Sequence, residues 1–212
     1  MEQKTAIVIG ASTGIGAATA EALAQQYKKI AITSFRHPEK LKEVQQKILA
    51  QGTDCYAETG DAGDFTFVKQ FIEHVTEHFS EKIDLLVNNA GISYVGLLTD
   101  MDETDWKRII DTNITSVFNT CRQVVPYMVH AHKGRIINIS SVWGNVGASC
   151  EVAYSACKGG INAFTKALGK ELAPSHIPVN AIACGVIDTD MNRCFDETER
   201  AELADEIPAG RF

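Results

Sequence analysis

The sequence AIVIGASTGIG, residues 6–16, joins a short apolar run to a glycine-rich loop. Ala6–Ile9 is apolar throughout and does not alternate with polar residues, which is typical of a strand buried on both faces of a parallel sheet. Glycines directly after such a strand allow a tight turn and let the backbone approach a pyrophosphate at the start of the next helix. The spacing is GxxxGxG and not GxGxxG, so a plain strand–helix turn stays open beside a dinucleotide-binding loop.

Strand-like and helix-like segments alternate along the rest of the chain. Further apolar runs, typical of buried strands, occupy Ile30–Thr33, Ile83–Val87, Arg135–Ile139 and Pro178–Ile182, with a weaker run at Asp54–Ala57. Apolar residues recur at helical spacing between these runs, in Gly14–Tyr27, Glu39–Gln51, Asp64–Phe79, Trp106–His130 and Ala153–Ala173. This alternation predicts an α/β fold, a three-layer, doubly wound parallel sheet of Rossmann type. No linker or repeat divides the sequence, so we expect residues 1–212 to form one domain.

Composition and charge exclude several classes of partner. Lys and Arg number 20 and Asp and Glu 27, a net charge of −7, and no basic run marks a nucleic-acid interface. No apolar stretch reaches the ~18–20 residues that span a membrane, and the first residues do not match a signal peptide. We therefore expect a cytoplasmic protein with reduced thiols at its six cysteines, Cys55, Cys121, Cys150, Cys157, Cys184 and Cys194.

We expect no metal site. His74 and His78 are spaced i, i+4, but no third ligand accompanies them, and a solvated helix face beside Glu73 and Glu77 is the favoured interpretation.

The residues after the second predicted strand bear on the nucleotide. An acidic residue there would bind the ribose 2′-hydroxyl of NAD, whereas an arginine pairs with the 2′-phosphate of NADP. Arg36 therefore favours NADP(H), with Ser34 as a further hydroxyl contact, although a solvated loop cation is the alternative for Arg36. Asp61, after the third strand, either accepts from the adenine amino group or caps the helix that begins near Asp64.

A tyrosine and a lysine four residues apart point to acid–base chemistry. Tyr154 and Lys158 share one face of a predicted helix. Because tyrosine has an ordinary pKa of ~10, a neighbouring ammonium that favours the phenolate should lower the pKa of Tyr154 toward a useful range. Tyr-x3-Lys alone is common by chance, but Ser141 and the sequence Asn-Asn-Ala-Gly at 88–91 make the combination specific.

Together these motifs resemble the short-chain dehydrogenase/reductase family over nearly the whole chain. The matching elements are GASTGIG (10–16), NNAG (88–91), Asn113 in DTNITS, Ser141 in NISS, YSACK (154–158) and VNAI (179–182). The resemblance implies a nicotinamide-dependent carbonyl/alcohol oxidoreductase. It also implies that Ser141 positions the carbonyl and Tyr154 transfers the proton, while Lys158 binds the nicotinamide ribose and lowers the Tyr154 pKa, and Asn113 anchors a proton relay.

The cofactor expected from the resemblance and from Arg36 is NADP(H). The residues expected to bind it are Gly10, Ser12, Thr13, Gly14, Ile15, Gly16, Ser34, Arg36, Asp61, Ala62, Asn89, Ala90, Gly91, Tyr154, Lys158, Gly185, Ile187 and Thr189. Trp143, Met191 and Asn192 are candidates for the wall of the substrate pocket, and a place in the core is the alternative for Trp143.

Within the family, GRIINISS and ELAPSHIPVN are similar to 3-oxoacyl-acyl-carrier-protein reductases of fatty acid synthesis. The stretches SVWGNVGASCEVAYSACK (141–158) and GVIDTDMN (185–192) resemble reductases of the 5-aminopentanone group on elongation factor P, which is the alternative substrate. A non-catalytic NADP-binding protein is an alternative of another class. The resemblance also implies a homo-oligomer, a dimer or tetramer.

Two features depart from the family pattern. Cys184-Gly185 stands where family members have Pro-Gly, and loss of the proline should loosen the turn around Val186 and Ile187 and alter cofactor affinity. A last strand and a C-terminal helix of the family have no counterpart in these 212 residues. We therefore expect the strand near Val179–Ile182 to be an uncovered edge.

Overall fold

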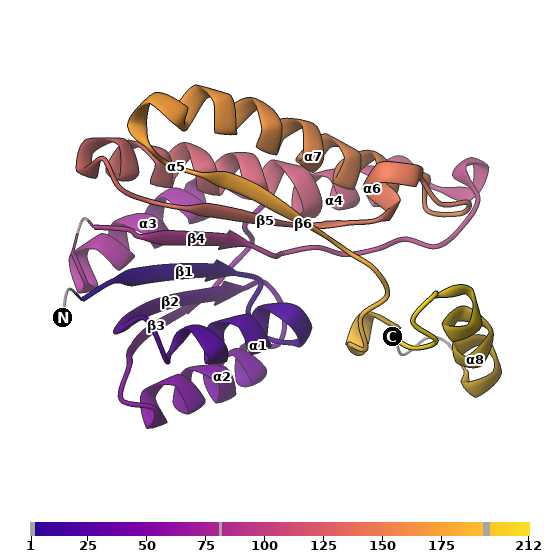
Figure 1. Cartoon of the computed structure of the whole chain (residues 1–212), viewed down its shortest axis with the longest axis horizontal. Helices are drawn as coiled ribbons and strands as arrows, with labels where there is room; N and C mark the ends of the chain where they lie inside the picture. The colour runs from indigo at the N-terminus through magenta and orange to yellow at the C-terminus, as the bar shows by residue number, and fades with distance from the viewer. Residues whose placement is uncertain (1–2, 81, 193–195) are drawn as a thin grey trace.

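The computed structural model describes residues 3–80, 82–192 and 196–212, and these contain one six-stranded parallel sheet (Figure 1). The strand order is β3-β2-β1-β4-β5-β6. The strands are β1 (Thr5–Ile9), β2 (Lys29–Ser34), β3 (Asp54–Thr59), β4 (Leu85–Asn88), β5 (Ile136–Ser141) and β6 (Val179–Cys184). The order reverses between β1 and β4, which is the switch point where ligands bind in doubly wound sheets. The predicted α/β architecture is confirmed.

Helices cover the two faces of the sheet in separate layers (Figure 1). The α-helices are α1 (Gly14–Leu23), α2 (Pro38–Ala50), α3 (Phe65–His78), α4 (Glu103–Ile110), α5 (Ser116–Ala131), α6 (Trp143–Val146), α7 (Val152–Leu172) and α8 (Glu197–Glu206). Short 3-10 turns are η1 (Leu98–Asp100), η3 (Ala173–Ser175) and η4 (Asp190–Asn192). Helix α8 lies beyond the carboxyl end of β6, beside the main body of the fold (Figure 1).

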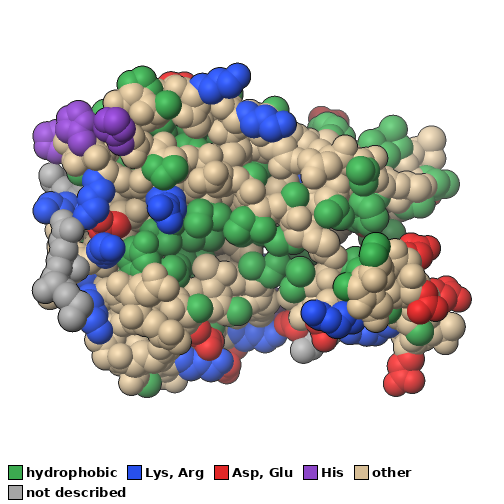
Figure 2. All heavy atoms as spheres, viewed as in Figure 1, with side chains coloured by type: hydrophobic (Ala, Val, Ile, Leu, Met, Phe, Trp, Pro, Cys, Tyr) green, Lys and Arg blue, Asp and Glu red, His purple; other side chains and the backbone are tan. Residues whose placement is uncertain are grey.

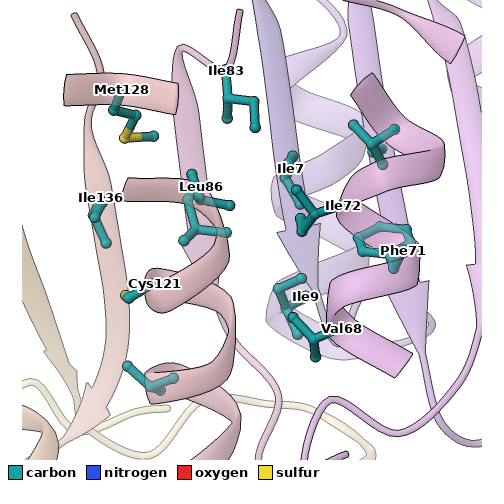
Figure 3. Close-up of a cluster of buried hydrophobic side chains, with 14 of the residues drawn as sticks. Ile7, Ile9, Val68, Phe71, Ile72, Ile83, Leu86, Cys121, Met128 and Ile136 are labelled. Carbon is teal, nitrogen blue, oxygen red and sulfur yellow. The ribbon is translucent and has the colours of Figure 1, made fainter. Parts of the chain in front are cut away.

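Alternate side chains of β1 enter two separate hydrophobic cores. Ile7 and Ile9 pack with residues of α3 and α5, among them Phe71 and Ile72 (Figure 3). Ala6 and Val8 point to the other face, where α1 and α2 supply a second core. A strand in the middle of a sheet with helices on both sides has no face for polar side chains, and this explains the apolar run in the sequence.

The segment predicted as one helix over Trp106–His130 contains a π-helical turn. Helix α4 passes through the π-helical residues η2 (Asp111–Thr115) into α5. Asn113 lies in this turn, and its Nδ2 donates to the backbone oxygens of Ile109 and Ile92, both at 2.9 Å. The side chain thus occupies the Ile109 carbonyl, which the backbone N–H of Asn113 would contact in a regular α-helix. A π-helical turn adds one residue to a helical turn, and the periodicity of apolar residues in the sequence does not reveal it.

A chain of polar side chains runs along one face of the sheet, beneath α5 and α7. Thr120 of α5 donates to Asn88 Oδ1 of β4 at 2.7 Å, Asn88 Nδ2 donates to Asn138 Oδ1 of β5 at 2.9 Å, and Asn138 Nδ2 donates to Thr165 Oγ1 of α7 at 2.9 Å. All four residues are buried. The chain therefore joins α5, β4, β5 and α7 through groups that have no access to water.

Strand β6 forms one edge of the sheet and pairs with β5 alone among the described strands. Its residues are half-buried or exposed, and Ile182 keeps 51% of its surface accessible. Figure 2 shows a band of hydrophobic side chains across the middle of this view, at the level of the sheet.

None of the helices in the described part of the chain is long and apolar enough to cross a membrane. The five cysteines within it are free thiols, and Cys194 lies outside the described residues.

Candidate active site

The glycine loop between β1 and α1 is held closely against the residues that follow β4. Gly10 has a φ of +79°, which favours glycine, and a Cβ added there would lie 2.7 Å from the backbone of Ala90. A Cβ added at Gly16 would lie 2.1 Å from the carbonyl oxygen of Gly10. Asn89 Nδ2 donates to that same oxygen at 2.7 Å. The two glycines are therefore required by close packing, and Asn89 supports the loop from the neighbouring strand.

A small cavity of about 30 Å³ opens at the carboxyl ends of the first strands. Its lining includes Gly10, Ser34, Asp61, Ala62, Ala90 and also Thr112, which the sequence did not suggest. Asp61 Oδ1 accepts from the Gly63 N–H at 2.8 Å, and Asn119 Nδ2 donates to the Ala62 and Gly63 oxygens at 3.0 Å. Asp64, not Asp61, caps α3 by accepting from the N–H groups of Thr66 and Phe67. The cavity brings together residues expected to contact the adenosine half of a dinucleotide.

The side chain of Ser34 has hydrogen-bond partners within the protein, whereas the side chain of Arg36 forms no ion pair within the described residues. Ser34 Oγ lies 2.8 Å from both Ser12 Oγ and the backbone oxygen of Arg36, so its hydroxyl organises the end of β2. The Arg36 side chain is exposed, and within residues 3–80, 82–192 and 196–212 its guanidinium forms no ion pair. The guanidinium is therefore available to an anionic ligand.

The four candidate catalytic residues come from β5, α7 and the π-helical turn and lie around one point. Lys158 is 3% exposed, and its Nζ donates to the Ile139 backbone oxygen at 2.9 Å and sits 5.4 Å from the centre of the Tyr154 ring. A Cβ added at Gly91 would lie 2.9 Å from Asn113 Oδ1 and 3.4 Å from Lys158 Nζ, so Gly91 allows both groups to approach. Ser141 contacts the phenol of Tyr154.

Burial dominates the electrostatics of this group. It lowers the pKa of Lys158 from the usual 10.5 to about 8 and raises the pKa of Tyr154 to about 12. The contact with Ser141 lowers the Tyr154 pKa in part, and the charge of Glu151 raises it further. The expectation that the pKa of Tyr154 would fall below its ordinary value is therefore wrong for this structure, because desolvation of the phenol raises that pKa.

Glu151 is a residue of the site that the sequence did not reveal. It precedes α7, is half-buried, and accepts a hydrogen bond from Ser93 Oγ at 2.5 Å. The Gly96 N–H donates to the Cys150 backbone oxygen at 2.9 Å, so the segment after β4 and the segment before α7 meet beside Tyr154. The only available signal was its position three residues before Tyr154, just ahead of the predicted helix.

The segment after β6 bends over the glycine loop. A Cβ at Gly14 would lie 3.2 Å from the Thr189 methyl group, and Lys40 Nζ of α2 pairs with Asp190 at 3.2 Å. Asn192 Nδ2 donates to the Ile187 backbone oxygen at 2.7 Å. Thr189 therefore lies beside the glycine loop, while Gly185 and Ile187 are exposed.

Trp143 is half-buried and Met191 is 48% exposed. Among the described residues, no group of three or more His, Cys, Asp or Glu is placed to hold a metal ion.

Comparison with known proteins shows the family to which this fold belongs. The family model for short chain dehydrogenases matches residues 4–200. The 3-oxoacyl-[acyl-carrier-protein] reductase FabG of Staphylococcus aureus is 39% identical over 209 residues, which cover 99% of this chain and 85% of that protein. The uncharacterized oxidoreductase YmfI of Bacillus subtilis is 38% identical over the same shares. A crystal structure of a single-residue variant of actinorhodin polyketide ketoreductase with NADPH matches with a TM-score of 0.92 and 30% identity, covering 100% of this chain and 85% of that one.

The sheet with its glycine loop at the switch point, together with a tyrosine and a lysine on one helix face, defines a Rossmann-type oxidoreductase. The chain belongs to the short-chain dehydrogenase/reductase family, whose members use a nicotinamide cofactor, NAD(P)H.

Proposed function

We propose that the protein is an NADPH-dependent reductase that converts a ketone to a secondary alcohol. The observation that carries this proposal is the convergence of the Tyr154 phenol, the Ser141 hydroxyl and the buried Lys158 ammonium at the carboxyl end of β5. Two neutral donors beside one point suit a carbonyl oxygen, and they become more effective as that oxygen gains negative charge. We also propose that residues 1–212 act as one domain.

The four residues divide the chemistry among them. The bound cofactor supplies the hydride that reduces the carbonyl carbon. Ser141 and Tyr154 hydrogen-bond the carbonyl oxygen, and Tyr154 donates its proton to that oxygen as the alcohol forms. Lys158, fixed by the Ile139 carbonyl, holds its charge 5.4 Å from the Tyr154 ring and favours the phenolate that results. Asn113 accepts and donates hydrogen bonds at Ile92 and so holds the backbone behind Lys158.

The site fits a phosphorylated dinucleotide. The glycine loop leaves no room for side chains at Gly10 and Gly16, a small cavity lies at the switch point, and Arg36 is an exposed cation that follows β2. Arg36 would bind the 2′-phosphate, while Ser12, Thr13 and the loop backbone would face the pyrophosphate. The related ketoreductase crystallised with NADPH supports the same choice.

The substrate proposed first is a 3-oxoacyl thioester on acyl carrier protein, as the name of the S. aureus relative indicates for that protein. The second candidate is the 5-aminopentanone group on elongation factor P. Glu151 favours this second substrate, because a carboxylate beside the phenol suits a substrate that carries a positive charge.

We also propose that the protein assembles as a homo-oligomer, a dimer or tetramer. Phe118 of α5 and Trp106 of α4 are 50% and 42% exposed, and large apolar side chains at the surface favour association.

The test of the proposed function follows NADPH oxidation by absorbance with 3-oxoacyl thioesters, simple ketones and an aminopentanone-modified protein. We expect turnover that falls at least about 1,000-fold in Tyr154→Phe, whereas binding of NADPH changes little. Tight binding of NADPH without turnover of any ketone would instead indicate a cofactor-binding protein without catalysis.

A further inference from the structure

Phe35 is an exposed aromatic residue directly after β2, between Ser34 and Arg36. Its side chain is 60% exposed, the largest fraction among the phenylalanines and tryptophans that the structure describes. None of the ring contacts within the described residues includes Phe35. The faces of the ring are therefore open to a ligand.

Phe35 lines the small cavity at the carboxyl ends of the first strands, together with residues 60–63 after the neighbouring strand β3. Among the described residues that line this cavity, Phe35 alone is exposed, and all the others are buried or half-buried. The cavity of about 30 Å³ has roughly the volume that one water molecule occupies in the liquid. A planar base would therefore lie across its opening, where Phe35 is exposed.

The backbone around Phe35 is fixed by hydrogen bonds on both sides. Ser34 Oγ lies 2.8 Å from the backbone oxygen of Arg36, so the turn is closed around Phe35. The Gly60 N–H donates to the Ser34 backbone oxygen at 3.0 Å and ties this turn to the end of β3. A ring on a fixed turn loses less conformational freedom when it binds a ligand than a ring on a mobile loop.

The cavity beside Phe35 also contains polar groups that the protein does not fully use. Thr33 is 1% exposed, and its Oγ1 has no hydrogen-bond partner among the described residues. Asp61 accepts one hydrogen bond through Oδ1, from the Gly63 N–H. An aromatic ring beside unused polar groups suits a ligand whose faces are apolar and whose edge has donors and acceptors, as in a purine base.

We propose that the Phe35 ring stacks on the adenine base of the dinucleotide, so that Phe35 is a binding residue for the base, while Arg36 next to it binds the 2′-phosphate. This inference rests on the proposed NADPH-dependent function. It assigns the two neighbouring side chains to different parts of the ligand. Phe35 contributes to the affinity for NADPH and NADH alike, because both contain adenine, whereas Arg36 distinguishes them.

The first test measures the Kd of NADPH and of NADH by fluorescence titration. Phe35→Leu keeps an apolar side chain but removes the ring, and it should weaken both complexes by about tenfold, as for loss of base–aromatic stacking. Its urea unfolding midpoint should equal that of wild type, because the side chain is exposed. Arg36→Ala should weaken the NADPH complex alone. Phe65→Leu, at a 43% exposed phenylalanine outside the cavity, is the matched control and should change neither Kd.

The second test locates the ring directly. Phe35→Trp keeps an aromatic ring and should bind NADP⁺ about as tightly as wild type. The wild-type sequence has two tryptophans, Trp106 and Trp143, so the emission of the new indole is obtained as the difference between variant and wild type. We expect NADP⁺ to quench this added emission, because the base would lie on the indole.

Unchanged affinity for both dinucleotides in Phe35→Leu, or a loss confined to NADPH, would overturn the inference. Added indole emission that stays constant while NADP⁺ binds would overturn it as well, since the ring would then lie away from the base. A wild-type protein that binds neither NADPH nor NADH would instead overturn the proposed function itself.

Discussion

Asn89 Nδ2 donates a hydrogen bond of 2.7 Å to the backbone carbonyl oxygen of Gly10. The two residues are far apart in sequence, and the bond fixes the glycine loop to the residues that follow β4. A Cβ at Gly16 would meet both partners of this bond, at 2.1 Å from the Gly10 oxygen and 2.5 Å from Asn89 Nδ2. The loop thus owes its shape to a neighbouring strand as well as to its own glycines.

Gly16→Ala should weaken NADPH binding at least about tenfold and lower the free energy of unfolding, because backbone atoms of Gly10 have to move. Fluorescence titration and urea unfolding measure the two effects. Gly169→Ala is the matched control, since its Cβ would lie 3.5 Å from the Val179 oxygen, an ordinary contact. That control should stabilise α7 by about 0.5–1 kcal/mol. Equal NADPH affinity in Gly16→Ala and wild type would contradict the role of the loop.

Arg36→Ala should remove the preference for NADPH over NADH, because its exposed guanidinium would lose the 2′-phosphate as a partner. We expect kcat/KM with NADPH to fall about 10- to 100-fold while the value with NADH changes little. Lys42→Ala removes another exposed cation, further along α2, and serves as control. A wild-type protein that works better with NADH would refute this assignment.

Lys158→Met should raise stability at neutral pH while it abolishes turnover. Burial lowers the pKa of Lys158 from 10.5 to about 8, so the unfolded state binds more protons between these pH values and the free energy of unfolding rises with pH there. Below pH 8 this buried group therefore costs wild-type stability, and the methionine variant should gain about 1–2 kcal/mol after loss of the bond to Ile139.

Urea unfolding of both proteins from pH 7 to pH 10 measures this difference, which should shrink as pH rises through the window. Lys166→Met, an exposed position of the same helix, should show no such dependence. A constant difference between wild type and Lys158→Met across the range would be inconsistent with the lowered pKa.

Glu151→Gln should lower the pKa of Tyr154, because the charge of Glu151 contributes to its rise to about 12. Oxidation of a secondary alcohol needs the phenolate, so its rate should rise with pH, and in the variant this rise should begin at lower pH. The pH dependence of kcat/KM for alcohol oxidation provides the measurement. An unshifted profile would mean that Glu151 and Tyr154 are not coupled.

Phe118→Glu should weaken self-association, since Phe118 is 50% exposed on α5 and a carboxylate resists burial in an interface. Sedimentation velocity over a range of concentrations should show a smaller species than wild type. Phe65→Glu, a 43% exposed phenylalanine at the start of α3, provides the comparison. An unchanged sedimentation coefficient would mean that α5 is not part of the interface.

The layers and strands were predictable because burial on both faces leaves a direct record in the sequence. Ile7 and Val8 face different cores, and both positions must be apolar. The glycine loop was predictable in place, since glycines directly follow β1. The π-helical turn was not, because the bond from Asn113 to Ile109 changes backbone spacing without changing the pattern of apolar residues.

The sequence predicts which residues gather at the candidate site better than it predicts the pKa values of those residues. The spacing of Tyr154 and Lys158 indicates that they are neighbours, but not how deeply each is buried, and depth decides the direction of the Tyr154 pKa shift. Glu151 escaped notice because its significance depends on Ser93, which approaches from another part of the chain. Contacts between distant segments leave no periodic signal in a single sequence.

The buried chain from Thr120 through Asn88 and Asn138 to Thr165 has a consequence for native-state fluctuations. Opening any one of α5, β4, β5 or α7 would leave polar atoms of the others without partners in an apolar interior. Amide protons of these four elements should therefore exchange with deuterium as one cooperative unit, at rates set by global unfolding. Helix α8 lies outside this unit and has no buried residue, so its amides should exchange first.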